Sequence, residues 1–313
     1  MTTKTPDTAT HYAFSDESHQ NTGQFRGLGL LTATKPKAQE IGRVMQGVLL
    51  ESGLKEFKWE RLKTQKVLFA AKKIVDLLVG VVEREQVRID VLVWDTRDGR
   101  HDIKGRDDRA NLERMYYHLL KTVLVKRWPE QCAWCLFPDE NRAIDWDTLR
   151  YFLERKAARL EFQQDLATGN ESLLRLVDEF RIHELSERQS HDEVLIQIAD
   201  LFVGLCIFSH SQYDKYEIWR VNNGGTQDMF VSSDCGGMDL SNAERTRSDL
   251  LHYFNKACKR RKLRVSLDTH RGLVTRDFTF PIGFWLWEAQ HDLDKAPTKS
   301  ETRHWPEEES KKP

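Results

Sequence analysis

The stretch from residue 192 to residue 209 limits the possible folds more than any other part of this 313-residue chain. It predicts a helix that is apolar on nearly every side, and such a helix has to be covered by the rest of the protein. Gln197 and Asp200 interrupt it, so it is too polar to span a bilayer. We therefore expect a buried helix inside a globular domain.

Strands and helices alternate along the first two thirds of the chain. Residues 87 to 95 show the clearest strand pattern, because alternate apolar residues share one face with Asp95. Two strands at the start, with a turn at Gly23, predict a hairpin. This order predicts a mixed α/β sheet flanked by helices. We expect strands over 12–16, 24–34, 87–95, 132–137 and 180–185, and helices over 36–50, 57–83, 107–128, 147–164 and 192–209.

The last third of the chain is an extension of that domain. We expect two short strands within residues 217–231, a helix over 243–262 and a strand near 263–267. The aromatic segment from Phe278 to Glu288 has too little neighbouring sequence for a core of its own, so it should dock on the main domain. The predicted organisation is a disordered segment 1–10, a core domain 11–210, an extension 211–293 packed on it, and a disordered charged tail 294–313.

Positive and negative charges are nearly balanced. The formal net charge is −1, so no global basic field attracts nucleic acid, and such binding has to use local patches. One basic patch could grip phosphates or could be a solvated helix end. It consists of Lys259, Arg260, Arg261 and Lys262.

The chain has the features of a cytoplasmic protein. Residues 1–10 lack the apolar segment of a signal peptide, and no run is long and apolar enough to cross a membrane. Five scattered cysteines fit reduced thiols. We therefore expect a cytoplasmic location and no membrane partner.

Three aspartates stand at the ends of predicted core elements or inside one. Asp16 ends the first strand, Asp95 ends the alternating strand, and Asp200 interrupts the apolar helix. Carboxylates placed in this way can hold Mg²⁺ or Mn²⁺, and such ions hydrolyse phosphodiesters with little further help from a protein. Asp is also favoured in turns, so Asp16 and Asp95 have a structural explanation that is equally good.

Asp200 is harder to explain structurally. A buried carboxylate without a partner costs several kcal/mol, so a partner or a metal is expected. Glu193, Gln197, Asp200 and Gly204 also form one narrow stripe, at the spacing i, i+4, i+7 and i+11. The alternative is a buried carboxylate that accepts hydrogen bonds from backbone donors.

Four more charged residues could assist these aspartates. Glu17 follows Asp16 but points to the other face of the strand. Lys58 and Glu60 stand at the entrance of a helix, where Lys58 could neutralise a phosphate or orient a carboxylate. Asp139 ends another strand and is a fourth carboxylate or a turn residue.

Residues 11 to 210 resemble the domain-of-unknown-function 3800 family. The resemblance implies a ribonuclease-H-like fold and a metal-dependent nuclease, and many members of the family look associated with mobile elements or phage defence. The motifs that carry it are Phe14-Ser15-Asp16-Glu17-Ser18 near the start, Phe57-Lys58-Trp59 before a helix, and Ile196-Gln197-Ile198-Ala199-Asp200-Leu201 in a late helix.

The resemblance also implies roles for individual residues. Asp16 corresponds to the acidic residue of the first strand, and Asp200 to the Asp of the late helix. Asp95 fits the carboxylate at the end of the fourth strand of a ribonuclease-H-like order, and Glu60 could occupy a helix position between them.

Two functions follow from these features. The first is a nuclease acting on DNA or RNA, in which Asp16, Asp95 and Asp200 converge to hold Mg²⁺ or Mn²⁺. The second is a non-catalytic recognition or scaffold protein that binds a protein partner through its C-terminal extension. Convergence of the three aspartates would favour the enzyme, and burial of their site under the protein's own loops would favour the scaffold.

Overall fold

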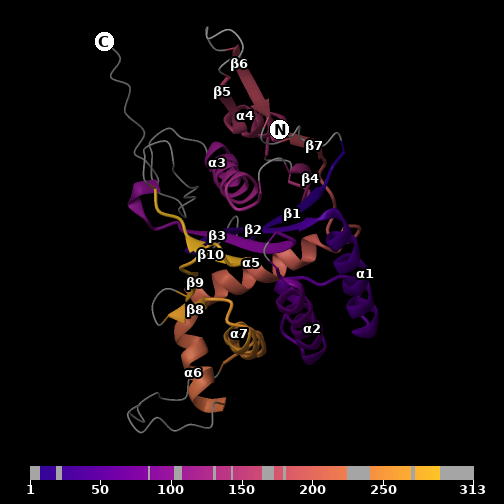
Figure 1. Ribbon diagram of the computed structural model, residues 1–313. Coiled ribbons are helices and arrows are strands. Elements are labelled where there is room, and N and C mark those ends of the chain that lie inside the picture. Colours follow the sequence, from indigo (N-terminus) through magenta and orange to yellow (C-terminus); the bar gives the residue numbers. More distant parts are fainter. Residues whose placement is uncertain are drawn as a thin grey trace, which may run out of the picture.

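A mixed six-stranded sheet with the strand order β10-β3-β2-β1-β4-β7 forms the centre of this α/β protein (Figure 1). The computed structural model describes residues 8–18, 23–83, 85–101, 108–129, 132–141, 144–163, 173–178, 181–223, 240–268 and 272–289. Strands β1 to β3 are antiparallel neighbours, β4 and β7 run parallel to β1, and β10 runs parallel to β3. The strands are β1 (His11–Ser18), β2 (Phe25–Thr34), β3 (Val87–Asp95), β4 (Ala133–Pro138), β7 (Arg181–Leu185) and β10 (Ile282–Leu286).

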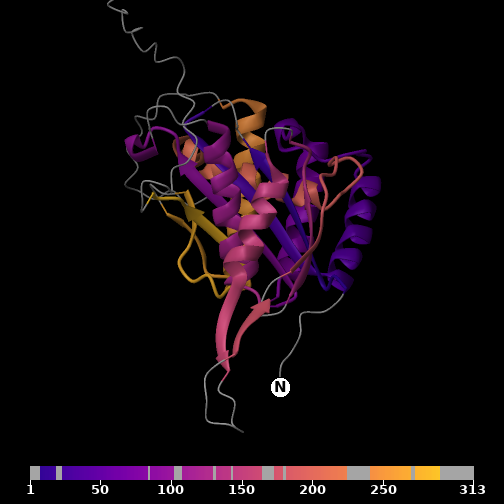
Figure 2. The same ribbon diagram turned by 90° about the horizontal axis from the view of Figure 1, so that it is seen from above.

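Helices cover both faces of this sheet. Helices α1, α2, α5 and α7 lie on one face, and α3 and α4 lie on the other (Figure 1). Figure 2 shows α3 and α4 over the sheet, with the hairpin β5 (Ala158–Gln163) and β6 (Leu173–Asp178) projecting beyond α4. The helices are α1 (Lys35–Glu51), α2 (Gln65–Val81), α3 (Asp108–Leu120), α4 (Trp146–Ala157), α5 (Ile196–Ser211), α6 (Tyr213–Asn223) and α7 (Asn242–Arg260).

The alternation along β3 divides its apolar side chains between two cores. Val91 and Val93 are buried in the core beneath α5, whereas Leu92 and Trp94 are buried in the core beneath α3. β3 also pairs with β2 on one side and with β10 on the other. The residues predicted as the clearest strand therefore form a central one.

Helix α5 lies directly on β2 because glycines stand where the two elements meet. A Cβ atom on Gly29 would lie 2.6 Å from the carbonyl oxygen of Ala199, and one on Gly27 would lie 3.0 Å from the side chain of Val203. From Ile196 to Ser209, every residue of α5 except Asp200 is buried. The apolar stretch is thus covered on nearly every side, as its sequence requires.

The chain beyond residue 210 shares these cores. Helix α7 packs on α2, and β10 extends the sheet beside β3. The guanidinium carbon of Arg127 lies 4.2 Å from the ring centre of Phe278 and 4.4 Å from that of Trp285, and Arg127 also pairs with buried Asp90. These cation–π contacts hold the aromatic segment against the domain. A second small antiparallel pair is formed by β8 (Val265–Asp268) and β9 (Gly272–Thr275).

Two predicted elements are wrong. The strands expected within residues 217–231 are replaced, up to Asn223, by helix α6, because Tyr216 and Trp219 form an apolar face that packs on α7. The helix expected over 147–164 ends at Ala157, where β5 begins.

Several expectations lie outside the described residues. These are the structure of residues 224–231 and the predicted disorder of residues 1–7 and 294–313. Within the described part of the chain, no helix is both long and apolar enough to cross a membrane.

The contact between α5 and β2 predicts a specific cost at Gly29. Gly29→Ala should lower the free energy of unfolding by about 1–3 kcal/mol, because its methyl group would meet backbone that cannot rotate away. Gly80→Ala is the control, since nothing lies within 4 Å of a Cβ atom there. Gly80 lies in the last turn of α2, where Ala should leave stability unchanged or raise it by up to about 1 kcal/mol. Chemical denaturation measures both effects, and equal effects would contradict the close approach.

Candidate active site

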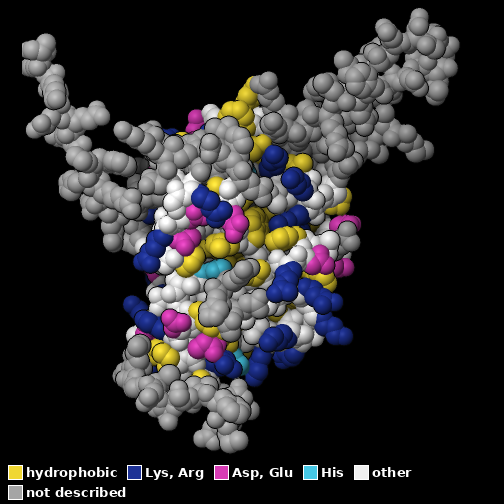
Figure 3. Space-filling model, turned by 90° about the vertical axis from the view of Figure 1, so that its left-hand side faces the viewer, with side chains coloured by type: hydrophobic (Ala, Val, Ile, Leu, Met, Phe, Trp, Pro, Cys, Tyr) yellow, Lys and Arg dark blue, Asp and Glu magenta, His cyan; other side chains and the backbone are white. Residues whose placement is uncertain are grey.

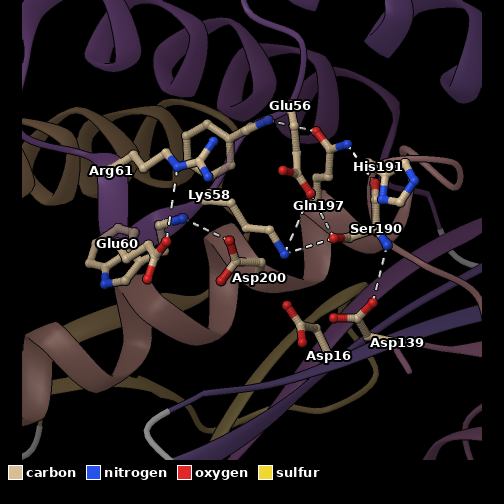
Figure 4. Close-up of polar contacts among 12 residues, drawn as sticks. Asp16, Glu56, Lys58, Glu60, Arg61, Asp139, Ser190, His191, Gln197 and Asp200 are labelled. Carbon is tan, nitrogen blue, oxygen red and sulfur yellow. Dashed lines mark hydrogen bonds and ion pairs between the residues drawn. The ribbon is translucent and has the colours of Figure 1, made fainter. Parts of the chain in front are cut away.

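Asp16 and Asp139 lie side by side on neighbouring parallel strands. The end of β4 pairs with β1 at Ser15, and the backbone N–H of Asp139 donates to the carbonyl oxygen of Ser15 at 2.9 Å. Both carboxylates point to the α5 side of the sheet, as Figure 4 shows. Asp16 is only 6% exposed, and its Oδ1 accepts a hydrogen bond from the N–H of Glu17 at 2.8 Å.

Asp200 reaches the same place from α5. Asp16 pairs with Gly29 across β1 and β2, and Gly29 contacts Ala199, the residue before Asp200. The glycine contact that seats α5 therefore also sets Asp200 above Asp16 (Figure 4).

The polar stripe of α5 holds the segment from Glu56 to Trp59. The N–H of Trp59 donates to Oδ2 of Asp200 at 2.7 Å, and the N–H of Phe57 donates to Oε1 of Gln197 at 2.9 Å. Gly204, the last member of the stripe, leaves room for the indole of Trp59, since a Cβ atom there would lie 2.2 Å from the ring. The polar stripe of α5 thus binds the segment from Glu56 to Trp59, and it also supplies the Asp200 carboxylate to the candidate site.

Lys58 projects from that segment toward the three carboxylates. Its ammonium group donates to Oγ of Ser190 at 2.7 Å and lies 3.5 Å from Oε1 of Glu56. Ser190 also binds Asp139, because its N–H donates to Oδ1 of Asp139 at 3.1 Å. One cation and one hydroxyl therefore border a group of three carboxylates (Figure 4).

The electrostatics of this group favour a further cation. Burial raises the pKa of Asp16 well above its usual range, and Asp200 and Asp139 raise it further, whereas Lys58 lowers it. Burial also raises the pKa of Asp139. Burial raises the pKa of Asp200 to about 6, although the Trp59 amide and Lys58 act in the opposite direction. Burial lowers the pKa of Lys58, but Glu56 and the three aspartates together keep it above its ordinary value.

The donors present suit Mg²⁺ or Mn²⁺. These ions prefer hard oxygen ligands, and the three carboxylates supply such oxygens. Because the site is partly buried, the carboxylates are weakly solvated and repel one another. Among the described residues, no three acidic, histidine or cysteine side chains already converge on one coordination centre. Binding an ion here therefore requires the carboxylates to rotate toward it.

Asp95 does not reach this group, which corrects our expectation that it would. In the register of the sheet, Asp16 pairs with Gly29 on β2, and Gly29 pairs with Val91 on β3. Asp95 lies four residues beyond Val91, which is roughly 13 Å along the strand. Its strand is the third of the sheet in chain order, and the fourth, β4, ends beside Asp139. Asp95 instead accepts hydrogen bonds from the side chain of Gln24 and the N–H of Arg97.

Glu17 and Glu60 lie at the margins of the site. Glu17 points into the opposite core, where Tyr116 and Asn141 donate to its carboxylate. Burial raises the pKa of Glu17 to about 7, although those two hydrogen bonds lower it. The side chain of Glu60 is 78% exposed, and it contributes to the raised pKa of Asp200.

The predicted basic patch is exposed at the far end of α7. From Arg247, which stacks on Trp59, to Arg260 is thirteen residues of helix, or roughly 20 Å. Figure 3 shows Lys and Arg side chains in separate groups among Asp and Glu on one face of the molecule. The patch Lys259–Lys262 therefore does not border the carboxylates.

Two residues of the site have no distinctive signal in the sequence, and a third has a weak one. Asp139, expected only as an auxiliary carboxylate or a turn residue, lies directly after a buried strand, and that position is its signal. Ser190 lies in a polar loop without a distinctive pattern. Arg247, whose guanidinium lies 5.1 Å from the ring centre of Trp59, comes from α7 in the extension, so only the fold brings it here.

The chain is similar over nearly its whole length to two proteins of one organism. Uncharacterized protein ORF2' of Methanothermobacter thermautotrophicus is 37% identical over 296 residues, which cover 92% of this chain and 98% of that protein. Uncharacterized protein ORF2 of the same organism is 36% identical over 296 residues, with the same coverage. No protein-family profile matches the chain.

The raised pKa of Asp200 predicts how stability depends on pH. Between pH 3.8 and about pH 6, the carboxyl of Asp200 is more protonated in the folded protein than in the unfolded chain. The free energy of unfolding of the metal-free protein therefore falls as the pH rises through that range. Asp200→Asn removes this loss. Near neutral pH the variant should equal wild type in stability or exceed it by about 1–2 kcal/mol, and the difference should shrink near pH 4.

Urea denaturation at several pH values measures this difference. If Asp200 is instead a structural acceptor, the Asn amide would place donors in a satisfied pocket. The variant would then lose about 1–3 kcal/mol near neutral pH, which contradicts the prediction.

Proposed function

The chain belongs to the family of the Methanothermobacter thermautotrophicus proteins ORF2' and ORF2, and we propose that it is a metal-dependent nuclease that hydrolyses phosphodiester bonds of DNA or RNA. The observation that carries the proposal is the meeting of Asp16, Asp139 and Asp200 from three separate elements on one side of the sheet (Figure 4). Asp139 and Asp200 each accept a backbone hydrogen bond, but these bonds do not require three carboxylates that repel one another to meet.

A ribonuclease-H-like fold is part of this proposal. That fold has three antiparallel strands followed by parallel strands on the side of the first strand. The order β3-β2-β1-β4-β7, with β4 and β7 parallel to β1, supports the assignment. The resemblance to the domain-of-unknown-function 3800 family points the same way and extends the proposal to a setting in phage defence or a mobile element.

The three aspartates would hold Mg²⁺ or Mn²⁺ at the edge of the sheet. A bound ion would activate water and offset charge on the attacked phosphate. Asp16, which is buried, would form the floor of the site, and a phosphate would approach on the side of Asp139, a residue that is partly exposed. Lys58 is placed to neutralise a phosphate oxygen on the side opposite the sheet.

One observation favours the alternative function, a recognition or scaffold protein without catalysis. Asp16 is only 6% exposed, and Lys58 and Ser190 lie over the carboxylates. In such a protein the acidic group would be a remnant, and binding would use other surfaces. Metal-dependent cleavage separates the two functions.

The proposal predicts that three substitutions abolish cleavage and one does not. Asp16→Asn, Asp139→Asn and Asp200→Asn should each reduce Mn²⁺-dependent cleavage of labelled DNA and RNA by about a hundredfold or more, because each removes an ion-holding oxygen. Asp95→Asn is the matched control and should retain wild-type activity, since Asp95 lies away from the site. Metal-dependent cleavage that survives all three substitutions would refute the site, and no cleavage by wild type would favour the scaffold function.

A further inference from the structure

We propose that a cavity formed by β1, α1 and the segment just before α5 binds one unpaired nucleobase of a single strand of DNA or RNA. The cavity encloses about 500 Å³, and sites for small molecules have volumes of roughly 300–1,000 Å³. The inference deepens the proposed function and depends on it for the class of ligand. It assigns a binding role to residues that the carboxylate site does not use.

The cavity lies on the same face of β1 as the candidate active site. Tyr12, Phe14 and Asp16 alternate along this strand, so their side chains share one face, and the first two line the cavity. Phe14 is two residues from Asp16, or roughly 7 Å along the strand. Glu193, the first member of the polar stripe that contains Asp200, also lines the cavity. A nucleotide whose base entered here would therefore have its backbone near the carboxylates.

Three aromatic rings pack together beside the cavity. The ring centres of Tyr12 and Phe14 lie 6.2 Å apart, and the ring centre of Phe137 on β4 lies 5.5 Å from each of them. Tyr12 is only half-buried, so a ligand in the cavity can contact its ring. Every base has a face that can stack on such a ring, provided that the base is not already stacked in a duplex. The aromatic lining therefore favours an unpaired base.

Helix α1 supplies polar side chains to the cavity. Gln39, Arg43 and Gln46 follow the spacing i, i+4 and i+7, so they share one face of the helix, and all three are exposed. A side-chain amide both donates and accepts hydrogen bonds, as the polar edge of a base does. The cavity thus offers an aromatic surface for the face of a base and amides for its edge.

The charges around the cavity indicate which part of a nucleotide enters it. Asp192 and Glu193 line the cavity, and their carboxylates would repel a phosphate placed inside. Arg43 is exposed at the cavity, and the ammonium group of Lys35 lies 5.8 Å from the ring centre of Tyr12. These two cations are placed to contact the phosphates that flank the base. The base therefore enters, and the backbone stays outside.

Two glycines of α1 provide a matched pair of variants. Gly42 lines the cavity and Gly47 lies outside it, and a Cβ atom on either would meet nothing within 4 Å. Gly42→Leu places a side chain in the cavity, whereas Gly47→Leu places the same side chain elsewhere on the helix. Both replace a glycine inside a helix, so both should keep or raise stability.

Binding of short, fluorescently labelled single strands of DNA and of RNA tests the inference. Anisotropy is measured on the full-length protein in EDTA, so that neither a metal ion nor cleavage contributes. Wild type should bind a single strand more tightly than the duplex of the same sequence. Gly42→Leu should lower the affinity for the single strand by about tenfold or more, because one base loses its stacking partner. Gly47→Leu should bind as wild type does.

Two further positions test the face of the base and the phosphate separately. Tyr12→Ala should lower the affinity about tenfold, and Tyr12→Phe, which keeps the ring, should not. Tyr151→Ala removes an exposed aromatic side chain of α4, on the other face of the sheet, and should bind as wild type does. Arg43→Gln should lower the slope of log affinity against log salt concentration by about 0.7, the loss of one phosphate contact.

The outcomes separate this inference from the proposed function. Equal affinities of wild type and a folded Gly42→Leu would overturn the inference, and thermal melting shows whether the variant is folded. If Gly42→Leu does not fold, an unchanged salt slope in Arg43→Gln overturns it instead. Metal-dependent cleavage of duplexes by a protein that binds no single strand would overturn the inference and leave the nuclease proposal in place. Single-strand binding that Gly42→Leu weakens, without any cleavage, would support the inference and overturn the nuclease proposal.

Discussion

The close approach of α5 to β2 at Gly29 is the contact on which the candidate site depends. It places the backbone of Ala199 against a strand residue that is paired with Asp16, so the next residue of the helix, Asp200, lies above that aspartate. Any side chain at Gly29 would lift the helix and separate the two carboxylates. The same helix then fixes Phe57 and Trp59 through Gln197 and Asp200, and so aims Lys58. The same contact therefore determines both how the apolar helix packs and where the polar residues of the site lie.

Much of this arrangement could be read from local patterns in the sequence. Alternation identified β3, and a polar residue inside an apolar helix identified Asp200, because burial without a partner is costly. Asp95 was misassigned because a strand-end aspartate looks the same whichever strand it ends. Only the order of strands in the sheet shows that β4 is the neighbour of β1 and that Asp139, not Asp95, stands beside Asp16.

The remaining errors come from contacts between distant segments. Residues 213–223 carry aromatic residues that suit a strand as well as a helix, and their packing on α7 decides for the helix. Arg247 stacks on Trp59 although the two residues are 188 positions apart, and no local pattern in either segment predicts this contact. Periodicity shows which face of an element is buried, but it does not show what covers that face.

The place of β10 at the edge of the sheet has a consequence for the newly made chain. β3 is a nine-residue strand of mostly apolar residues, and its outer edge is covered by a segment that ends only at Leu286. Until that segment leaves the ribosome, or in any chain cut short before it, the long edge of β3 stays open to pairing with another molecule. Five-residue β10 replaces that edge with a short one. Once β10 has been made and has paired with β3, the finished protein thus exposes a shorter edge for self-association.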